Sequence, residues 1–134
     1  MILGVDPGER RVGVALADEE TRFARPLEVI DVATTEPVAR LSELAAEHGA
    51  TLVVVGRPLS LSGNAERAVA DAAPFVEALR DALSAEVVEH DERLTTVIAE
   101  RSLRAGGASS AARKKMRDAV AASVMLQGYL DGRR

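Results

Sequence analysis

The sequence predicts a mixed α/β fold in which helices flank a five-stranded sheet. Two apolar segments joined by a Pro-Gly turn open the chain, and a third strand-like segment follows them. Helix-like and strand-like segments then alternate, so the first three strands should be antiparallel and the later strands parallel. A length of 134 residues with 47% apolar residues suits one core. We therefore expect residues 1–134 to form a single domain.

Each predicted strand is a short apolar run bounded by turn residues. Pro26 indicates an edge position or a bulge in the third strand, because proline cannot donate a ladder hydrogen bond. The continuous apolar run TLVVVG is typical of a strand covered on both faces. The strands are predicted at residues 1–6, 11–17, 23–31, 51–56 and 86–90.

The predicted helices carry apolar residues at helical spacing. Thr35 is a candidate N-cap for the first helix, and Gly49 is expected to end it. Pro74 inside the second helix predicts a kink or a late start. The helices are predicted over residues 36–48, 65–83, 96–105 and 112–131.

Composition excludes several classes of site. Without cysteine there can be no disulfide, thiolate zinc site or cysteine nucleophile, which also fits a reducing compartment. Two histidines and three other aromatic residues are too few for a histidine-rich metal site or a base-stacking platform. A net charge of -4 means that binding a polyanion requires a local basic patch. No apolar run predicts a membrane span or a secretory signal.

Acidic residues fall at the ends of apolar elements. Asp6 ends the first strand, Asp91 and Glu92 end the fifth, and Asp118 lies on the last helix. Ligands of α/β sheets gather at the carboxyl ends of strands, and a helix packed across the sheet could bring Asp118 there. Converging carboxylates repel one another, and Mg²⁺ or Mn²⁺ would relieve that repulsion. Such a site can hydrolyse a phosphodiester, although each acid taken alone is better explained as a turn former or a surface residue.

Basic residues lie beside these acids in the sequence. The run Arg113, Lys114 and Lys115 closely precedes Asp118, and it could contact phosphates or simply be a solvated helical turn. Further candidate contacts at the same rim are Arg11, Arg57 and Arg93.

Four motifs in order resemble the YqgF/RuvX family of Holliday junction resolvase-like proteins. The opening matches D-x-G-x-x-R-x-G-x-A-x-x-D from Asp6 to Asp18, and VVVGRPLSLSG over 53–63 is close to V-V-G-x-P-L-N-x-x-G. DERLTTVIAE over 91–100 and KKMRDAVAASVMLQGYLD over 114–131 are similar to the remaining two motifs. Together the motifs cover nearly the whole chain.

The resemblance implies a ribonuclease H-like fold and metal-dependent hydrolysis with Mg²⁺ or Mn²⁺. It also implies a cytoplasmic bacterial protein that processes the 5′ end of the small-subunit ribosomal RNA precursor, with junction-resolving activity as the alternative. Asp6 and Asp118 correspond to the first-strand and last-helix acids of the family. The third metal ligand corresponds to Asp91 or Glu92, and we favour Glu92 for its longer reach. The expected partners are structured RNA, branched DNA and the ribosomal precursor, with no membrane partner.

Two other functions stay open at this point. The fourth strand ends in Gly56-Arg57 without the carboxylate that many ribonuclease H-like nucleases place there, and Ser60 replaces the family's usual Asn. A non-catalytic RNA- or ribosome-binding module on the same fold is therefore an alternative. An ATPase of the actin type shares the Asp-x-Gly turn, but needs two lobes where 134 residues supply one. The two-fold symmetry of a junction would suit a homodimer.

Overall fold

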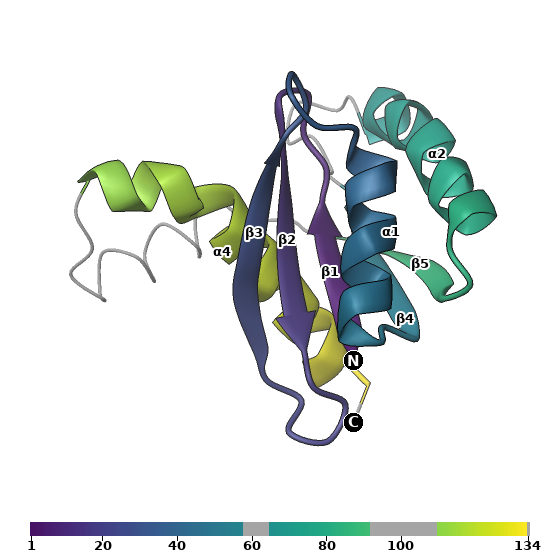
Figure 1. Cartoon of the computed structure of the whole chain (residues 1–134), viewed down its shortest axis with the longest axis vertical. Helices are drawn as coiled ribbons and strands as arrows, with labels where there is room; N and C mark the ends of the chain where they lie inside the picture. The colour runs from purple at the N-terminus through teal and green to yellow at the C-terminus, as the bar shows by residue number, and fades with distance from the viewer. Residues whose placement is uncertain (58–64, 92–109, 134) are drawn as a thin grey trace.

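The computed structural model describes residues 1–57, 65–91 and 110–133, with backbone alone for 57, 65–72, 91 and 110–115. The described elements form a sheet with helices on both faces (Figure 1). The strands are β1 (Ile2–Asp6), β2 (Arg11–Ala17), β3 (Ala24–Asp31), β4 (Leu52–Arg57) and β5 (Glu86–Asp91). The helices, numbered as in Figure 1, are α1 (Pro37–His48), α2 (Ala65–Ala82) and α4 (Ser110–Asp131).

The sheet has the predicted mixed topology, with strand order β3-β2-β1-β4-β5. The pairs β1–β2 and β2–β3 are antiparallel, whereas β1–β4 and β4–β5 are parallel. The expectation for Pro26 is also confirmed, because β3 is an edge strand whose register shifts opposite Val14 and Ala15. As a result, β1, β4 and β5 all terminate at the same end of the sheet, which we call the carboxyl edge, and β2 begins there.

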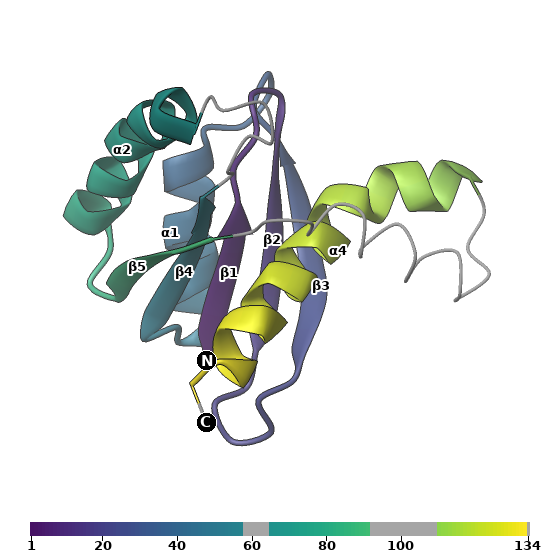
Figure 2. The same ribbon diagram turned by 180° about the vertical axis from the view of Figure 1, so that it is seen from behind.

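Two separate apolar clusters lie on the two faces of the sheet. On one face, Leu41 and Leu44 of α1 and Val76 and Leu79 of α2 pack against alternate strand residues. On the other face, Leu126 of α4 belongs to a cluster of its own with the sheet. Figure 2 shows α4 crossing this second face diagonally, with its N-terminal part projecting past β3. No helix in the described part of the chain is long and apolar enough to cross a membrane.

The N-cap predicted for α1 is wrong by one residue. Glu36, not Thr35, occupies the cap, and its carboxylate accepts a hydrogen bond of 2.6 Å from the amide of Ala39. A glutamate can replace the shorter threonine here because Pro37 fixes the first helical residue and brings the Ala39 amide within reach. Gly49 ends the helix in the left-handed conformation, as expected.

Two of the remaining helix predictions need a correction, and the third is not tested. Helix α2 is continuous through Pro74, so a late start at that proline is wrong. Helix α4 begins at Ser110, two residues earlier than predicted, because small residues such as Ser110 and Ala111 can enter the helix. The helix predicted over 96–105 lies outside the described residues.

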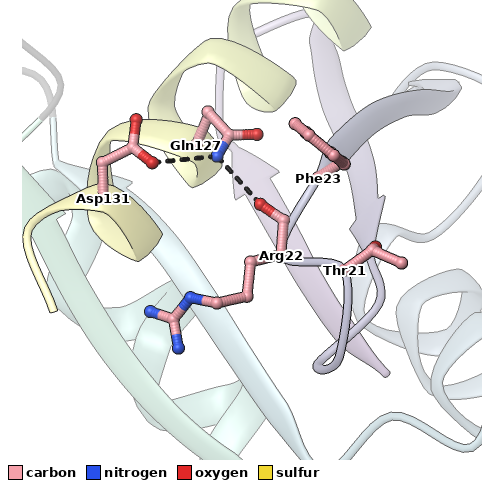
Figure 3. A pocket seen from close by; sticks show the side chains of 5 residues that line it. All are labelled: Thr21, Arg22, Phe23, Gln127 and Asp131. Atoms are coloured by element: carbon pink, nitrogen blue, oxygen red, sulfur yellow. Dashed lines mark hydrogen bonds between the residues drawn. The ribbon is translucent and has the colours of Figure 1, made fainter. Parts of the chain in front are cut away.

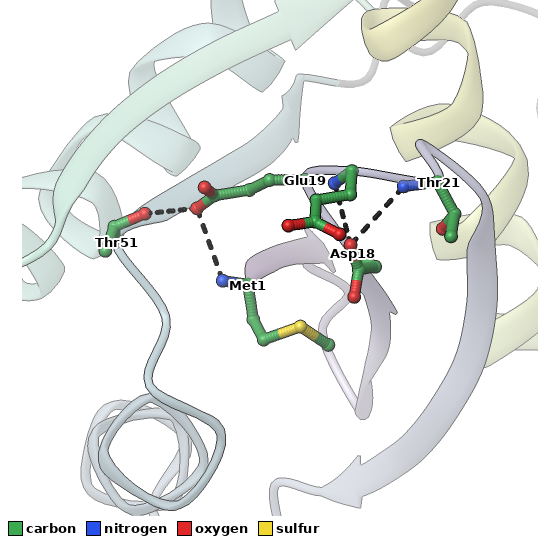
Figure 4. Close-up of polar contacts among 6 residues, drawn as sticks. Met1, Asp18, Glu19, Thr21 and Thr51 are labelled. Carbon is green, nitrogen blue, oxygen red and sulfur yellow. Dashed lines mark hydrogen bonds and ion pairs between the residues drawn. The ribbon is translucent and has the colours of Figure 1, made fainter.

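A polar cluster fixes the opposite edge of the sheet, where the chain begins (Figure 4). The Glu19 carboxylate lies 3.2 Å from the N-terminal ammonium and accepts a 2.7 Å hydrogen bond from the Thr51 hydroxyl. These two contacts, the Thr51 bond first, lower the pKa of Glu19. They tie the β2–β3 loop to the start of β1 and the segment entering β4.

Candidate active site

Asp6 lies on the face of the sheet that α4 covers. Along β1, Ile2 belongs to the α4 cluster and Gly4 contacts Leu126 of α4. Because side chains alternate between faces with a period of two, Asp6 shares this face. Asp6 is half-buried and ends the strand.

Gly13 brings helix α4 to Asp6. It is the register partner of Asp6 across the β1–β2 pair, and antiparallel partners lie roughly 5 Å apart at their Cα atoms. A Cβ atom added to Gly13 would overlap the carbonyl oxygen of Asp118, so the backbone of α4 rests directly on this residue. Asp6 and Asp118, 112 positions apart in the sequence, therefore both lie against Gly13.

A second glycine fixes the direction in which α4 crosses the sheet. A Cβ atom on Gly4 would lie 2.8 Å from the Cβ of Leu126, which is closer than side chains pack. Leu126 lies eight residues after Asp118, or about 12 Å along a helix. With contacts at Gly4 and Gly13, the helix can lie only in an orientation that puts Asp118 at the carboxyl edge of β1.

Arg11 neutralises Asp118 in this arrangement. Its Nε atom donates to the Asp118 Oδ2 at 2.7 Å, from the first residue of β2 to the middle of α4. Arg11 stands two residues before Gly13 and so faces the same side of the sheet. The Arg11 and Asp118 side chains are 43% and 26% exposed, which leaves the pair open to solvent. Sequence reasoning predicted Arg11 as a phosphate contact and missed this ion pair.

The donor chemistry of Asp6 and Asp118 fits a hard divalent cation. Mg²⁺ and Mn²⁺ take carboxylate oxygens together with water, and both acids are accessible at an open edge. Within the described ranges, no group of three histidine, cysteine or acidic side chains could hold a metal ion. Of the three predicted ligands, Asp6 and Asp118 are among the described residues, and Glu92 lies outside them.

Strand β5 ends at the same edge as β1, two strands away. Val88 packs in the α4 cluster, and the His90 ring makes an edge-to-face contact with Tyr129 of α4 at 5.5 Å between centroids. Val87 instead packs on the α1–α2 face. The last β5 residue, Asp91, is the register partner of Arg57 in β4. The backbones of Arg57 and Asp91, which are both predicted site residues, therefore lie at this edge.

Three of the predicted basic residues lie on the helix that carries Asp118. Arg113, Lys114 and Lys115 form part of α4, within its first two turns and just before Asp118. The projecting N-terminal part of α4 in Figure 2 is this portion of the helix. Arg93 lies outside the described residues.

A hollow of about 640 Å³ lies at the opposite end of the sheet from Asp6 (Figure 3). The Gln127 amide donates to the Arg22 carbonyl at 2.9 Å and to the Asp131 carboxylate at 3.1 Å, which joins α4 to the β2–β3 loop. The hollow is lined by Thr21, Arg22, Phe23, Gln127 and Asp131. None of these residues belongs to the predicted site. This hollow is therefore separate from the predicted acids.

Comparison of the amino-acid sequence with known proteins identifies a family. Residues 1–132 match the profile of RuvX, which is described as a Holliday junction resolvase. The chain belongs to the RuvX family. A Chloroflexus aggregans relative named "Putative pre-16S rRNA nuclease" is 47% identical, and the match covers 99% of this chain and 94% of the relative. A Bacillus cytotoxicus relative with the same name is 38% identical over 98% of both chains.

Solved structures agree with the RuvX assignment at the level of the fold. The structure "T. thermophilus RuvC in complex with Holliday junction substrate" matches with a TM-score of 0.59 at 21% identity, over 98% of this chain and 94% of that one. The Fowlpox virus resolvase, solved with Holliday junction DNA, matches with a TM-score of 0.56 at 9% identity, over 98% and 97%. The predicted family and ribonuclease H-like fold are confirmed, and the predicted nuclease class agrees with the names of the RuvX relatives.

Proposed function

We propose that this RuvX protein is a metal-dependent nuclease that hydrolyses phosphodiester bonds of structured nucleic acid. The observation that carries the proposal is the convergence of Asp6 and Asp118 on Gly13 at the carboxyl edge of β1. The backbones of both acids meet at Gly13, so a divalent cation at this edge could take a carboxylate oxygen from each. Bound Mg²⁺ or Mn²⁺ would supply an activated water and neutralise charge on the reacting phosphate.

Glu92 is our choice for the third metal ligand, with Asp91 as the alternative. Val88 and His90 face the α4 side of the sheet, and Val87 faces the other side. Counting onward by two along the sequence from Val88 and His90 favours position 92 over position 91. The acid that the fourth strand lacks would then be replaced from the segment after β5.

The basic residues have the role of holding and orienting the substrate phosphates. Positions 114 and 118 are four apart in α4, and positions 115 and 118 three apart, so both lysine positions are neighbours of position 118 on the helix surface. We assign Lys114 and Lys115, with Arg113, to the backbone of a nucleic acid whose scissile phosphate would sit at Asp6 and Asp118. Arg57, the last residue of β4, and Arg93 are further candidates for phosphate contact at this rim. Local positive charge is needed because the net charge of the chain is -4.

The substrate we propose is the precursor of the small-subunit ribosomal RNA, cleaved at its 5′ end in the bacterial cytoplasm. The names of the RuvX relatives support this choice over branched DNA. Residues 1–134 act as a single nuclease domain in this proposal. Branched DNA, bound by a homodimer, is the alternative that the resolvase fold suggests.

The test is a cleavage assay on precursor RNA and on four-way DNA junctions with Mg²⁺, Mn²⁺ or EDTA. We expect metal-dependent cleavage of the RNA that falls by at least about 100-fold in both Asp6→Asn and Asp118→Asn, since each removes a ligand charge. Glu9→Gln, in the β1–β2 turn, is the matched control and should keep its activity. Preferential cleavage of the junction would favour the resolvase alternative.

One result would reject catalysis altogether. Tight, salt-sensitive RNA binding with no turnover under any metal condition would leave only the non-catalytic binding module. Turnover that survives unchanged in both Asp variants would instead reject these residues as the site.

A further inference from the structure

We propose that Arg11 competes with the divalent metal for the Asp118 carboxylate, and that metal binding releases Arg11 to contact a substrate phosphate. The inference rests on the metal-binding part of the proposed function, but not on cleavage. Arg11 would pair first with the Asp118 carboxylate and then with a substrate phosphate, both of which are negatively charged. Metal and nucleic-acid binding would thereby be coupled through one side chain.

The backbones on both sides of the ion pair are fixed. Asp118 is held because the backbone of α4 rests on Gly13. Arg11 is the first residue of β2, and the next backbone contact, from the Val32 amide to the Arg10 carbonyl at 3.0 Å, holds this end of the hairpin. Only the side chains can therefore rearrange when a cation arrives.

The contact geometry makes Arg11 and a metal compete for the Asp118 carboxylate. The Arg11 Nε donates to Oδ2 at 2.7 Å and so occupies one of the two oxygens that Asp118 offers to a cation. A divalent ion on this carboxylate would stand within a few ångströms of the guanidinium, and the like charges would repel. The weaker partner leaves, since an exposed ion pair contributes little free energy.

Solvent-accessible space is available into which the Arg11 side chain can move. It is 43% exposed and lies at the open edge of the sheet, on the same face as Asp6. A guanidinium displaced from Asp118 can swing outward without crossing the core. A phosphate bound at Asp6 and Asp118 would present oxygens that match its planar donors.

The first experiment measures Mn²⁺ affinity by electron paramagnetic resonance in the full-length protein without nucleic acid. Arg11→Gln should bind Mn²⁺ about five-fold more tightly than the wild type, because the competitor is gone. Arg10→Gln removes the same charge one residue away and should change the affinity by less than about two-fold. Arg11→Lys keeps the charge but loses the Nε donor, and should fall between them.

The second experiment measures binding to a labelled RNA hairpin by fluorescence anisotropy, with Ca²⁺ or EDTA. In the wild type, Ca²⁺ should strengthen binding and steepen the dependence on salt. In Arg11→Gln the slope of log affinity against log salt with Ca²⁺ should be shallower by about one phosphate contact. With EDTA the two proteins should have the same slope, because Arg11 is then engaged by Asp118.

Each outcome has a definite reading. Equal Mn²⁺ affinities for Arg11→Gln and Arg10→Gln, in a protein whose Mn²⁺ binding falls in Asp118→Asn, would overturn the competition and leave the proposed nuclease intact. The predicted difference in a protein that never cleaves nucleic acid would support the competition and reject the proposed function. Mn²⁺ binding unaffected by Asp118→Asn would overturn the competition and the metal site together.

Discussion

The carbonyl oxygen of Asp118 occupies the space that a side chain on Gly13 would fill. Gly13 is also the register partner of Asp6, so one backbone contact sets the relation between the two acids of the candidate site. The position of α4, and with it the site, depends on this glycine having no side chain.

Replacing Gly13 by alanine should destabilise the fold and disturb the site. The added methyl group would meet backbone rather than a movable side chain, so α4 must shift, at a cost of about 3 kcal/mol in the free energy of unfolding. Urea denaturation measures this loss. The same substitution at Gly128 of α4 is the control, because a Cβ there meets nothing closer than 3.9 Å. Gly128→Ala should gain about 1 kcal/mol from helix propensity, and a Gly13→Ala protein as stable as the wild type would contradict the contact.

The ion pair between β3 and α1 should make stability depend on pH. Arg40 donates to both carboxylate oxygens of Glu28, at 2.8 and 2.7 Å, and this lowers the pKa of Glu28. A lowered folded-state pKa stabilises the protein above the ordinary value of 4.5, and this stabilisation disappears as the pH falls through the folded-state value. Glu28→Gln should therefore lower Tm at pH 7, and the difference from the wild type should disappear once the pH falls below the folded-state pKa of Glu28. Glu47→Gln, an exposed position on α1, should show no such convergence.

Lys114 and Lys115 should each contribute one phosphate contact. Neutralising either one as Lys114→Gln or Lys115→Gln should reduce the slope of log affinity against log salt by about 0.7 to 0.9, as measured by RNA-binding titrations at several salt concentrations. Arg80→Gln is the matched control, because α2 packs on the opposite face of the sheet from α4. Equal slopes for all three variants would remove this basic run from the interface.

The strands could be predicted from the sequence because each is a short apolar run between turn residues. The predicted span 11–17 coincides with β2, and the others differ from the observed strands by a residue or so at an end. The N-cap of α1 was predicted one residue too early. Thr35 belongs to a residue type that is preferred at helix N-caps, but the residue after it, Glu36, occupies the cap. The start of α4 was missed because glycine and serine residues before it read as loop.

The site was predictable only in part. The positions of Asp6 and Asp118 in their elements, and the four motifs around them, predicted that they would meet. The ion pair between Arg11 and Asp118 could not be predicted, because it depends on the angle at which α4 crosses the sheet. That angle follows from the contacts of Gly4 with Leu126 and of Gly13 with Asp118. Glycines spaced along two neighbouring strands are the only sequence signal for it.

The central claim is that Asp6 and Asp118 bind one divalent metal together. A crystal structure grown with Mn²⁺, with anomalous difference density recorded, tests this most directly. We predict a peak within about 2.2 Å of a carboxylate oxygen of both residues, with the Arg11 side chain turned away from Asp118. A manganese ion bound elsewhere, with Arg11 still bonded to Asp118, would contradict the account.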